Sequence, residues 1–294
     1  MSVSSRAVAV VDHGELDALR EFAFSDADFR SLSALAYEQA GIVLSDSKRN
    51  LVYGRLSRRL RALGLNSFRD YREYLADKAG KDEMEHFINA ISTNLTKFFR
   101  ESHHFDHFRD HLAVPFSRSA IEPRTQRLRV WSAGCSSGEE PYTIAAVLRQ
   151  AIPNIARYDV RILATDIDTN ILAKAASGEY SFDALAEVPG IYREFFRRVD
   201  DGQAPMVVVS DNLRCLITFR RLNLIGPWPF RGMFDAIFCR NVMIYFDNST
   251  KQTLVDRFAA QIRPGGWLYI GHSESLLGGH PGLRLVGRTV YGRV

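Results

Sequence analysis

The chain has 294 residues, of which 46% are hydrophobic, and its formal net charge is +4. This length can bury a sizeable core, in one large domain or in two unequal ones. No apolar run approaches the roughly 18–20 residues that cross a bilayer, and residues 7–11 are too few for a signal-peptide core. The three cysteines form no CxxC pair, which favours a reduced cytoplasm and no metal site. The basic charge by itself suits an acidic partner, either nucleic acid or an acidic protein face.

The first part of the chain has a helical pattern. Residues 1–24 lack a sustained pattern and are predicted to form a flexible arm. Ser25 or Asp26 is a typical helix N-cap, and Gly41 ends that helix. Apolar residues at helical spacing predict three further helices, at 46–63, 68–78 and 82–92. Because no strand pattern precedes residue 127, residues 25–92 are predicted to form a small helical domain, with 93–126 as a linker.

Strands and helices alternate from residue 127 to the end of the chain. Such alternation predicts a parallel sheet with helices on both faces. The predicted strands are 128–132, 160–164, 234–239 and 267–271, and the predicted helices are 142–151, 169–177 and 249–262. Residues 283–294 predict an antiparallel hairpin at the sheet edge. Residues 179–223 interrupt the alternation, and there 206–209 and 216–221 predict a short β pair in a small inserted subdomain.

The loop after the first predicted strand has the composition of a ligand site. Small residues around Gly134 and Gly138 let a ligand approach the backbone, but Glu139 and Glu140 would repel a pyrophosphate. The spacing is not GxGxxG, and no lysine follows Gly138 as it does in a P-loop. Adjacent carboxylates suit a cation, and the adenosyl cofactor that carries one is S-adenosylmethionine. A tight turn without any ligand is the alternative interpretation.

Polar residues also follow two other predicted strands. Asp166 ends the second strand, where a carboxylate can accept hydrogen bonds from two ribose hydroxyls. Arg240 and Asn241 follow the strand 234–239, and an amide can both donate and accept. Because ligands of doubly wound folds bind at the carboxyl ends of strands, these residues support a cofactor site.

Residues 93–101, with the sequence TNLTKFFRE, join the helical part to the sheet part. Arg100 can orient a carboxylate through two parallel hydrogen bonds. The alternative is a salt bridge to Glu101 or Asp106. His103 and His104 are neighbours in the sequence and do not share a helix face, so they do not indicate a metal site.

The predicted helix at 46–63 is rich in arginine. Arg55, Arg58 and Arg59 lie at i, i+3 and i+4, where they form one patch, and Asp46 is the only acid of the helix. Such a patch is either an ordinary solvated face or, since its charges are uncompensated, a docking surface for an acidic helix or a phosphate backbone.

Five segments resemble the chemotaxis-receptor methyltransferases, the CheR family, and they occur in the family's order. They are 96–101, 132–142, 164–168, 234–247 and 271–275. The resemblance extends from Ser25 to Tyr291. It implies a class I, Rossmann-like methyltransferase domain with a seven-stranded sheet, a small all-α N-terminal domain and an inserted β-subdomain. It also implies a cytoplasmic enzyme that transfers methyl groups from S-adenosylmethionine to glutamates of chemoreceptor helices.

The resemblance further implies roles for particular residues. Arg100 and Tyr245 would be catalytic, and the arginine-rich helix with Arg55, Arg58 and Arg59 would dock the receptor. No metal, nucleic acid or membrane insertion is implied. In some members the β-subdomain also binds a peptide at the receptor's C-terminus, but the turn 199–205 does not clearly match those members. The implied cofactor-binding residues are Asn94, Thr96, Arg100, Glu140, Asp166, Asn223, Leu224, Asn241 and Val242.

The implied reaction needs few catalytic groups, because a glutamate with a pKa of about 4.3 is already an anionic nucleophile at neutral pH. Arg100 and Tyr245 are expected to orient that carboxylate, although Arg100 could instead close the site around the cofactor. One alternative function is a methyltransferase for nucleic acid or a small molecule, but residues 241–245 lack the prolines of base-binding clamps. The other alternative is a non-catalytic, cofactor-sensing adaptor. It is disfavoured because Arg100, Glu140, Asp166 and Tyr245 are all present.

Overall fold

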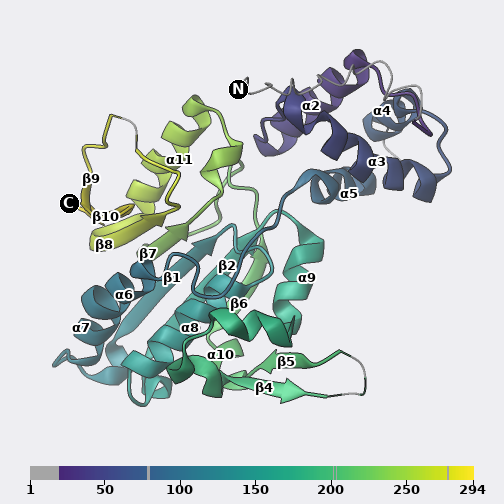
Figure 1. The fold of residues 1–294 in the computed structure, drawn as a ribbon. Coiled ribbons are helices and arrows are strands. Elements are labelled where there is room, and N and C mark those ends of the chain that lie inside the picture. The colour runs from purple at the N-terminus through teal and green to yellow at the C-terminus, as the bar shows by residue number, and fades with distance from the viewer. Residues whose placement is uncertain (1–19, 78–79, 201, 203, 277) are drawn as a thin grey trace, which may run out of the picture. The chain divides into compact units, whose positions relative to one another are not determined.

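The computed structural model describes residues 20–77, 80–200, 202, 204–276 and 278–294 (Figure 1). The chain divides into two compact units, Met1–Ile91 and Ser92–Val294. Within the described ranges, no helix combines the length and apolar character that a membrane crossing requires. Most of the expected N-terminal arm, residues 1–19, lies outside the described residues.

The described part of the first unit is helical. Ser25 caps the first helix: its hydroxyl accepts from the N–H of Asp28, and the Asp28 carboxylate accepts from the N–H of Ser25. Gly41 and Gly64 end two helices in the left-handed conformation. The helices are α2 (Asp26–Ala40), the short η1 (Asp46–Lys48), α3 (Arg49–Leu63), α4 (Phe68–Ala76) and α5 (Lys81–Ile91). The predicted helices are therefore confirmed.

Residues 20–24 do not belong to a loose arm, so that expectation is wrong for them. Phe22 and Phe24 are buried, and the ring of Phe24 lies 4.4 Å from the ring of Phe68. The two phenylalanines are not part of a helical or strand periodicity, so the sequence did not predict that they are buried. They are ordered because they complete the core of the helical unit.

A seven-stranded sheet forms the centre of the second unit. Its strands lie in the order β6-β2-β1-β7-β8-β10-β9. The first five are parallel, and β10 and β9 form the antiparallel hairpin predicted at the edge. The bounds are β1 (Arg127–Ala133), β2 (Asp159–Asp166), β6 (Ile217–Arg221), β7 (Phe234–Cys239), β8 (Ile262–Ile270), β9 (Leu283–Gly287) and β10 (Val290–Arg293). This is the predicted class I methyltransferase architecture.

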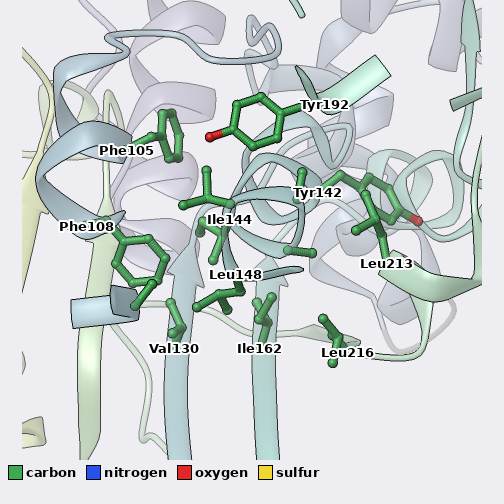
Figure 2. Packing of buried hydrophobic residues seen from close by; sticks show 14 of the residues in the cluster. Phe105, Phe108, Val130, Tyr142, Ile144, Leu148, Ile162, Tyr192, Leu213 and Leu216 are labelled. Atoms are coloured by element: carbon green, nitrogen blue, oxygen red, sulfur yellow. The ribbon is translucent and has the colours of Figure 1, made fainter. Parts of the chain in front are cut away.

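Side chains alternate between the two faces of the sheet along β1. Val130 packs in one cluster with Ile162 and with Leu148 of α8 (Glu139–Ala151), as Figure 2 shows. Trp131 faces the other side, in a cluster with Phe258 of α11 (Asn248–Gln261). Helices α8 and α11 therefore cover opposite faces.

Residues 93–126 are not a simple linker, which corrects that prediction. They contain α6 (His103–Phe108), the π-helical turn η3 (Arg109–Ala113), α7 (Val114–Ser117) and η4 (Pro123–Thr125). Phe105 and Phe108 pack in the same cluster as Val130 (Figure 2). The segment belongs to the second unit because these rings cover one face of the sheet.

A three-stranded antiparallel sheet interrupts the main alternation. It consists of β3 (Glu179–Ser181), β4 (Phe196–Val199) and β5 (Met206–Val209), with β5 in the centre. The predicted pairing of 206–209 with 216–221 is wrong, because β6 pairs in parallel with β2. Short apolar strands do not specify their partners from sequence alone. The remaining elements are η5 (Ile155–Arg157), α9 (Thr169–Ser177), η6 (Phe182–Glu187), η7 (Gly190–Phe195), α10 (Asp211–Arg214) and η8 (Met243–Tyr245).

Candidate active site

The turn between β1 and α8 requires glycine at two positions. Gly134 and Gly138 have φ angles of 82° and 96°. A Cβ atom on Gly134 would lie 2.4 Å from Cγ2 of Val242, and one on Gly138 would lie 2.8 Å from the Tyr180 hydroxyl. Helix α8 begins at Glu139 rather than at Tyr142, so the two adjacent carboxylates lie in its first turn.

Glu139 and Glu140 are both buried but have different partners. Glu139 accepts a hydrogen bond of 2.6 Å from the Ser137 hydroxyl. Glu140 accepts one of 2.7 Å from Ser132 and pairs with Arg240 at 3.1 Å. Burial raises the pKa of Glu140, and the charge of Arg240 opposes that rise. The two acids are therefore not equivalent, and Glu140 is the one connected to the end of β7.

Asp166 lies at the end of β2, the strand next to β1. Its carboxylate accepts from the N–H of Ser136 at 2.8 Å and from the N–H of Asp168 at 3.0 Å. Burial raises its pKa, although these N–H groups oppose the rise. A carboxylate has about four acceptor positions, so acceptor capacity remains for a ligand.

Asn94 is held in this region by Asp168. Its amide donates to Asp168 Oδ2 at 2.8 Å, while Asp168 Oδ1 caps helix α9 by accepting from the N–H groups of Asn170 and Ile171. Asp168 was not predicted as a site residue. The signal for it was an acid directly before a predicted helix.

Three further candidates follow β6 and β7. The N–H of Leu222 bonds to the carbonyl of Asp166 at 2.9 Å, which places Asn223 and the buried Leu224 near the end of β2. Asn241 has a left-handed φ of 58°. Its Oδ1 is buried and has no hydrogen-bond partner among the described residues. An orphaned acceptor of this kind is typical of a ligand site.

The segment that carries Arg100 has an unusual backbone. Phe99 and Glu101, on either side of Arg100, have left-handed φ angles of 52° and 55°. The Arg100 guanidinium donates to the carbonyl of Leu95 at 2.8 Å, and Thr96 between them is half-buried. Glu101 pairs with Arg240 and His272. The alternative of a salt bridge between Arg100 and Glu101 therefore finds no support in these contacts.

Arg240 joins this segment to the sheet. Its side chain is 3% exposed, and it pairs with Glu140 at 3.1 Å and with Glu101 at 3.4 Å. It also donates to the carbonyl of Arg100 and lies over the Phe105 ring. Burial raises the pKa of Glu101, but the hydrogen bond to His272 and the charge of Arg240 outweigh it and hold that pKa below its usual value. Sequence reasoning placed Arg240 at a strand end but did not predict this network.

Tyr245 ends η8, the turn that follows β7, and its side chain is accessible to solvent. Its hydroxyl lies 3.5 Å from the carbonyl of Thr93, at the start of the segment that carries Arg100. This distance is at the limit of a hydrogen bond. It nevertheless brings the two predicted catalytic residues, Arg100 and Tyr245, onto neighbouring segments of the second unit.

The arginines of α3 differ in their surroundings within the first unit. Arg59 makes two hydrogen bonds, of 2.9 and 2.6 Å, to the buried Glu83. Arg55 donates to the carbonyls of Ala90 and Ile91 at the end of α5. Arg58 is exposed. The expectation of an uncompensated patch is therefore wrong for Arg59, whose partner lies on another helix.

Comparisons with known proteins agree with this geometry. Residues 27–92 match the family model described as "CheR methyltransferase, all-alpha domain", and residues 94–291 match "CheR methyltransferase, SAM binding domain". A probable chemotaxis protein methyltransferase of Rhizobium etli is 46% identical over 83% of this chain and 91% of its own length. Chemotaxis protein methyltransferase 2 of Pseudomonas aeruginosa is 42% identical over 92% and 95%. The chemotaxis protein methyltransferase of Escherichia coli is 42% identical over 94% of each chain.

Proposed function

The chain belongs to the CheR family of S-adenosylmethionine-dependent methyltransferases, and we propose that it methylates glutamates of chemoreceptors. We propose that its active site lies at the carboxyl ends of β1, β2, β6 and β7. The observation that carries this assignment is the pair of buried carboxylates, Glu140 and Asp166, beside a turn that only glycine fits. When bound, S-adenosylmethionine supplies an activated methyl group on a positively charged sulfur. The residues of the chain bind this donor and align the acceptor.

The residues present fit the cofactor. Asp166 keeps acceptor capacity for a ribose hydroxyl beside its backbone N–H bonds. The unpaired Oδ1 of Asn241 and the unpaired Oγ of Ser136 offer further polar atoms, considering the described residues alone. Glu139, Glu140 and Asp166 together outnumber Arg240, so the local charge is negative and favours a cationic ligand.

We assign the orientation of the substrate carboxylate to Arg100 and Tyr245. A guanidinium has five N–H donors, so the bond from Arg100 to Leu95 leaves donors for a carboxylate. No general base is needed, because the acceptor glutamate is already ionised at neutral pH. Alignment in line with the donor can contribute up to about 7–11 kcal/mol of barrier lowering. If Arg100 bound the substrate carboxylate too tightly, it would stabilise the ground state and slow the reaction. Arg100 therefore has to orient the carboxylate without burying the ion pair deeply.

Two surfaces are proposed for the receptor. On α3, Arg58 is the exposed member of the arginine patch, while Arg55 and Arg59 also fix the helical core through their bonds to α5. In the small sheet, β4 is an edge strand, and Arg198 lies 5.1 Å from the Phe182 ring. A receptor C-terminal peptide could add to this edge as a further strand, with its carboxylate near the arginine. A cytoplasmic location follows from a substrate on cytoplasmic receptor helices.

The two alternative functions are not favoured. The relatives named above are chemotaxis protein methyltransferases, rather than methyltransferases for nucleic acids or small molecules. An adaptor without turnover would not need the arginine and tyrosine beside the cofactor site.

A transfer assay tests the proposal. The protein is incubated with radiolabelled S-adenosylmethionine and with receptor cytoplasmic fragments, RNA or DNA. We expect label on the receptor that is released by mild base, since methyl esters are base-labile. Base-stable label, or label on nucleic acid, would contradict the proposal. Calorimetric titration with S-adenosylhomocysteine checks the cofactor site separately, and absence of binding would overturn it.

A further inference from the structure

Glu274, in the segment 271–275, has no role in the proposed function so far. Its carboxylate is buried, with 6% of the residue exposed. Oε2 accepts from the N–H of Gly271 at 2.6 Å and from the N–H of Asn241 at 2.9 Å. Oε1 accepts from the N–H of Ile244 at 3.2 Å. One buried carboxylate is thus stabilised by three backbone donors.

The three donors come from the segments that follow two neighbouring strands, β7 and β8. Gly271 directly follows β8, whereas Asn241 and Ile244 belong to the turn after β7. Ile244 directly precedes Tyr245, and Asn241 carries the orphaned side-chain oxygen. Glu274 therefore bonds to the backbone of one cofactor residue and to the backbone beside one catalytic residue.

The backbone around Asn241 is left-handed and tightly packed. A φ of 58° is uncommon for a residue other than glycine, although asparagine tolerates it better than most. A Cβ atom on Gly271 would lie 2.7 Å from the N atom of Asn241, so the two strand ends are in close contact. The Glu274 carboxylate bonds to both N–H groups at this contact, which fixes the left-handed conformation of Asn241 against the end of β8.

We propose that Glu274 is a positioning residue, which holds the turn after β7 so that Asn241 faces the cofactor and Tyr245 faces the acceptor glutamate. This inference rests on the proposed function of Asn241 and Tyr245. The two oxygens have separate tasks: Oε2 fixes Asn241 against β8, and Oε1 fixes the turn before Tyr245.

This division can be tested with two substitutions. In Glu274→Gln, the remaining oxygen is best placed on the two donors that now bind Oε2, so the new NH2 group faces the N–H of Ile244. Glu274→Ala removes all three bonds. We expect Glu274→Gln to lower kcat about tenfold, the size of one lost hydrogen bond, with the Kd of S-adenosylhomocysteine within about threefold of wild type. Glu274→Ala should lower kcat and also weaken binding by about tenfold or more.

Asp235→Asn is the matched control. Asp235 is a buried acid at the opposite end of β7 and also accepts a backbone N–H, from Arg129 at 2.6 Å. The control should lower the Tm and leave kcat per folded molecule unchanged. If Glu274→Ala does not fold, the kcat values of Glu274→Gln and Asp235→Asn are compared, together with the loss of Tm that each variant shows. Equal losses of kcat in these two variants would overturn the inference.

A double-mutant cycle separates this inference from the proposed function. Tyr245→Phe alone tests the catalytic assignment, and an unchanged kcat would refute that assignment. If Glu274 acts through the Tyr245 turn, Glu274→Gln should cost much less in the Tyr245→Phe background than in wild type. An equal, additive loss in both backgrounds would overturn the positioning role even though the proposed function stands. A Kd that rises as much in Glu274→Gln as in Glu274→Ala would overturn it too.

Discussion

Replacing Arg240 with methionine should destabilise the second unit strongly. The substitution keeps the apolar stem and removes the charge that pairs with the buried Glu140 and with Glu101, which is only partly buried and keeps His272 as a partner. Breaking a buried ion pair by removing one partner costs about 3–5 kcal/mol, because the remaining charge loses its compensation. The bond to the carbonyl of Arg100 is lost as well. We expect the free energy of unfolding at pH 7.5 to fall by about this amount.

The loss should be smaller at pH 5 than at pH 7.5. Burial already raises the pKa of Glu140, and without Arg240 that pKa rises further. A carboxyl whose pKa is higher in the folded state destabilises the fold progressively as pH rises from its unfolded pKa, about 4.3, to its folded pKa. The pKa of Glu101 is held low partly by Arg240, and the stabilisation that this gives is present above the unfolded pKa and lost as pH falls. Glu140 therefore makes the difference from wild type larger at pH 7.5 than at pH 5, whereas the contribution of Glu101 changes only below about pH 4.3.

Urea unfolding followed by tryptophan fluorescence measures this effect. All three tryptophans, Trp131, Trp228 and Trp267, lie in the second unit, so the signal reports on that unit. The control is Arg198→Met, which removes an ion pair to Asp200 whose side chains are 58% and 63% exposed. It should cost less than about 1 kcal/mol. The reasoning would be refuted by an equally small loss in Arg240→Met, or by a loss that does not depend on pH.

Three other substitutions, two of them with a matched control, test the candidate site and the helical unit. Gly134→Ala should weaken S-adenosylhomocysteine binding at least about tenfold in calorimetry, because its Cβ meets Val242, whereas Gly232→Ala, with open space around it, should not. Arg100→Ala should lower kcat by about 10²-fold with little change in cofactor Kd, and a parallel loss of binding would contradict the orientation role. Arg59→Met should lower the unfolding free energy of the first unit by about 3 kcal/mol in circular dichroism. Arg58→Met should leave that stability unchanged and weaken only receptor methylation.

Elements with their own local signals were predictable from the sequence. Helix α9 spans Thr169–Ser177 as predicted, because Asp168 caps it and Gly178 ends it. Strand β7 spans Phe234–Cys239 as predicted, since it is a short apolar run with clear ends. The partner of β6 was not predictable, because strand pairing depends on contacts between residues far apart in the sequence.

The same distinction applies to the site. The convergence of Glu140, Asp166 and Asn241 could be predicted because parallel strands bring their carboxyl ends to one edge. The contacts of Arg240 and Glu274 could not, since each joins segments far apart in the sequence or depends on the turn geometry. Buried charges find their partners only when the chain has folded, so their pairing leaves no local pattern.

The strand order has a consequence for where the site can lie. The chain leaves β1 through α8 on one face of the sheet, and it leaves β7 through α11 on the other face. The two adjacent strands therefore end at a topological switch point, which is where open α/β sheets generally bind their ligands. Gly134 and Val242 approach each other there. The location of the proposed cofactor site is thus a property of the path of the chain, and the side chains at the strand ends decide only which ligand that location suits.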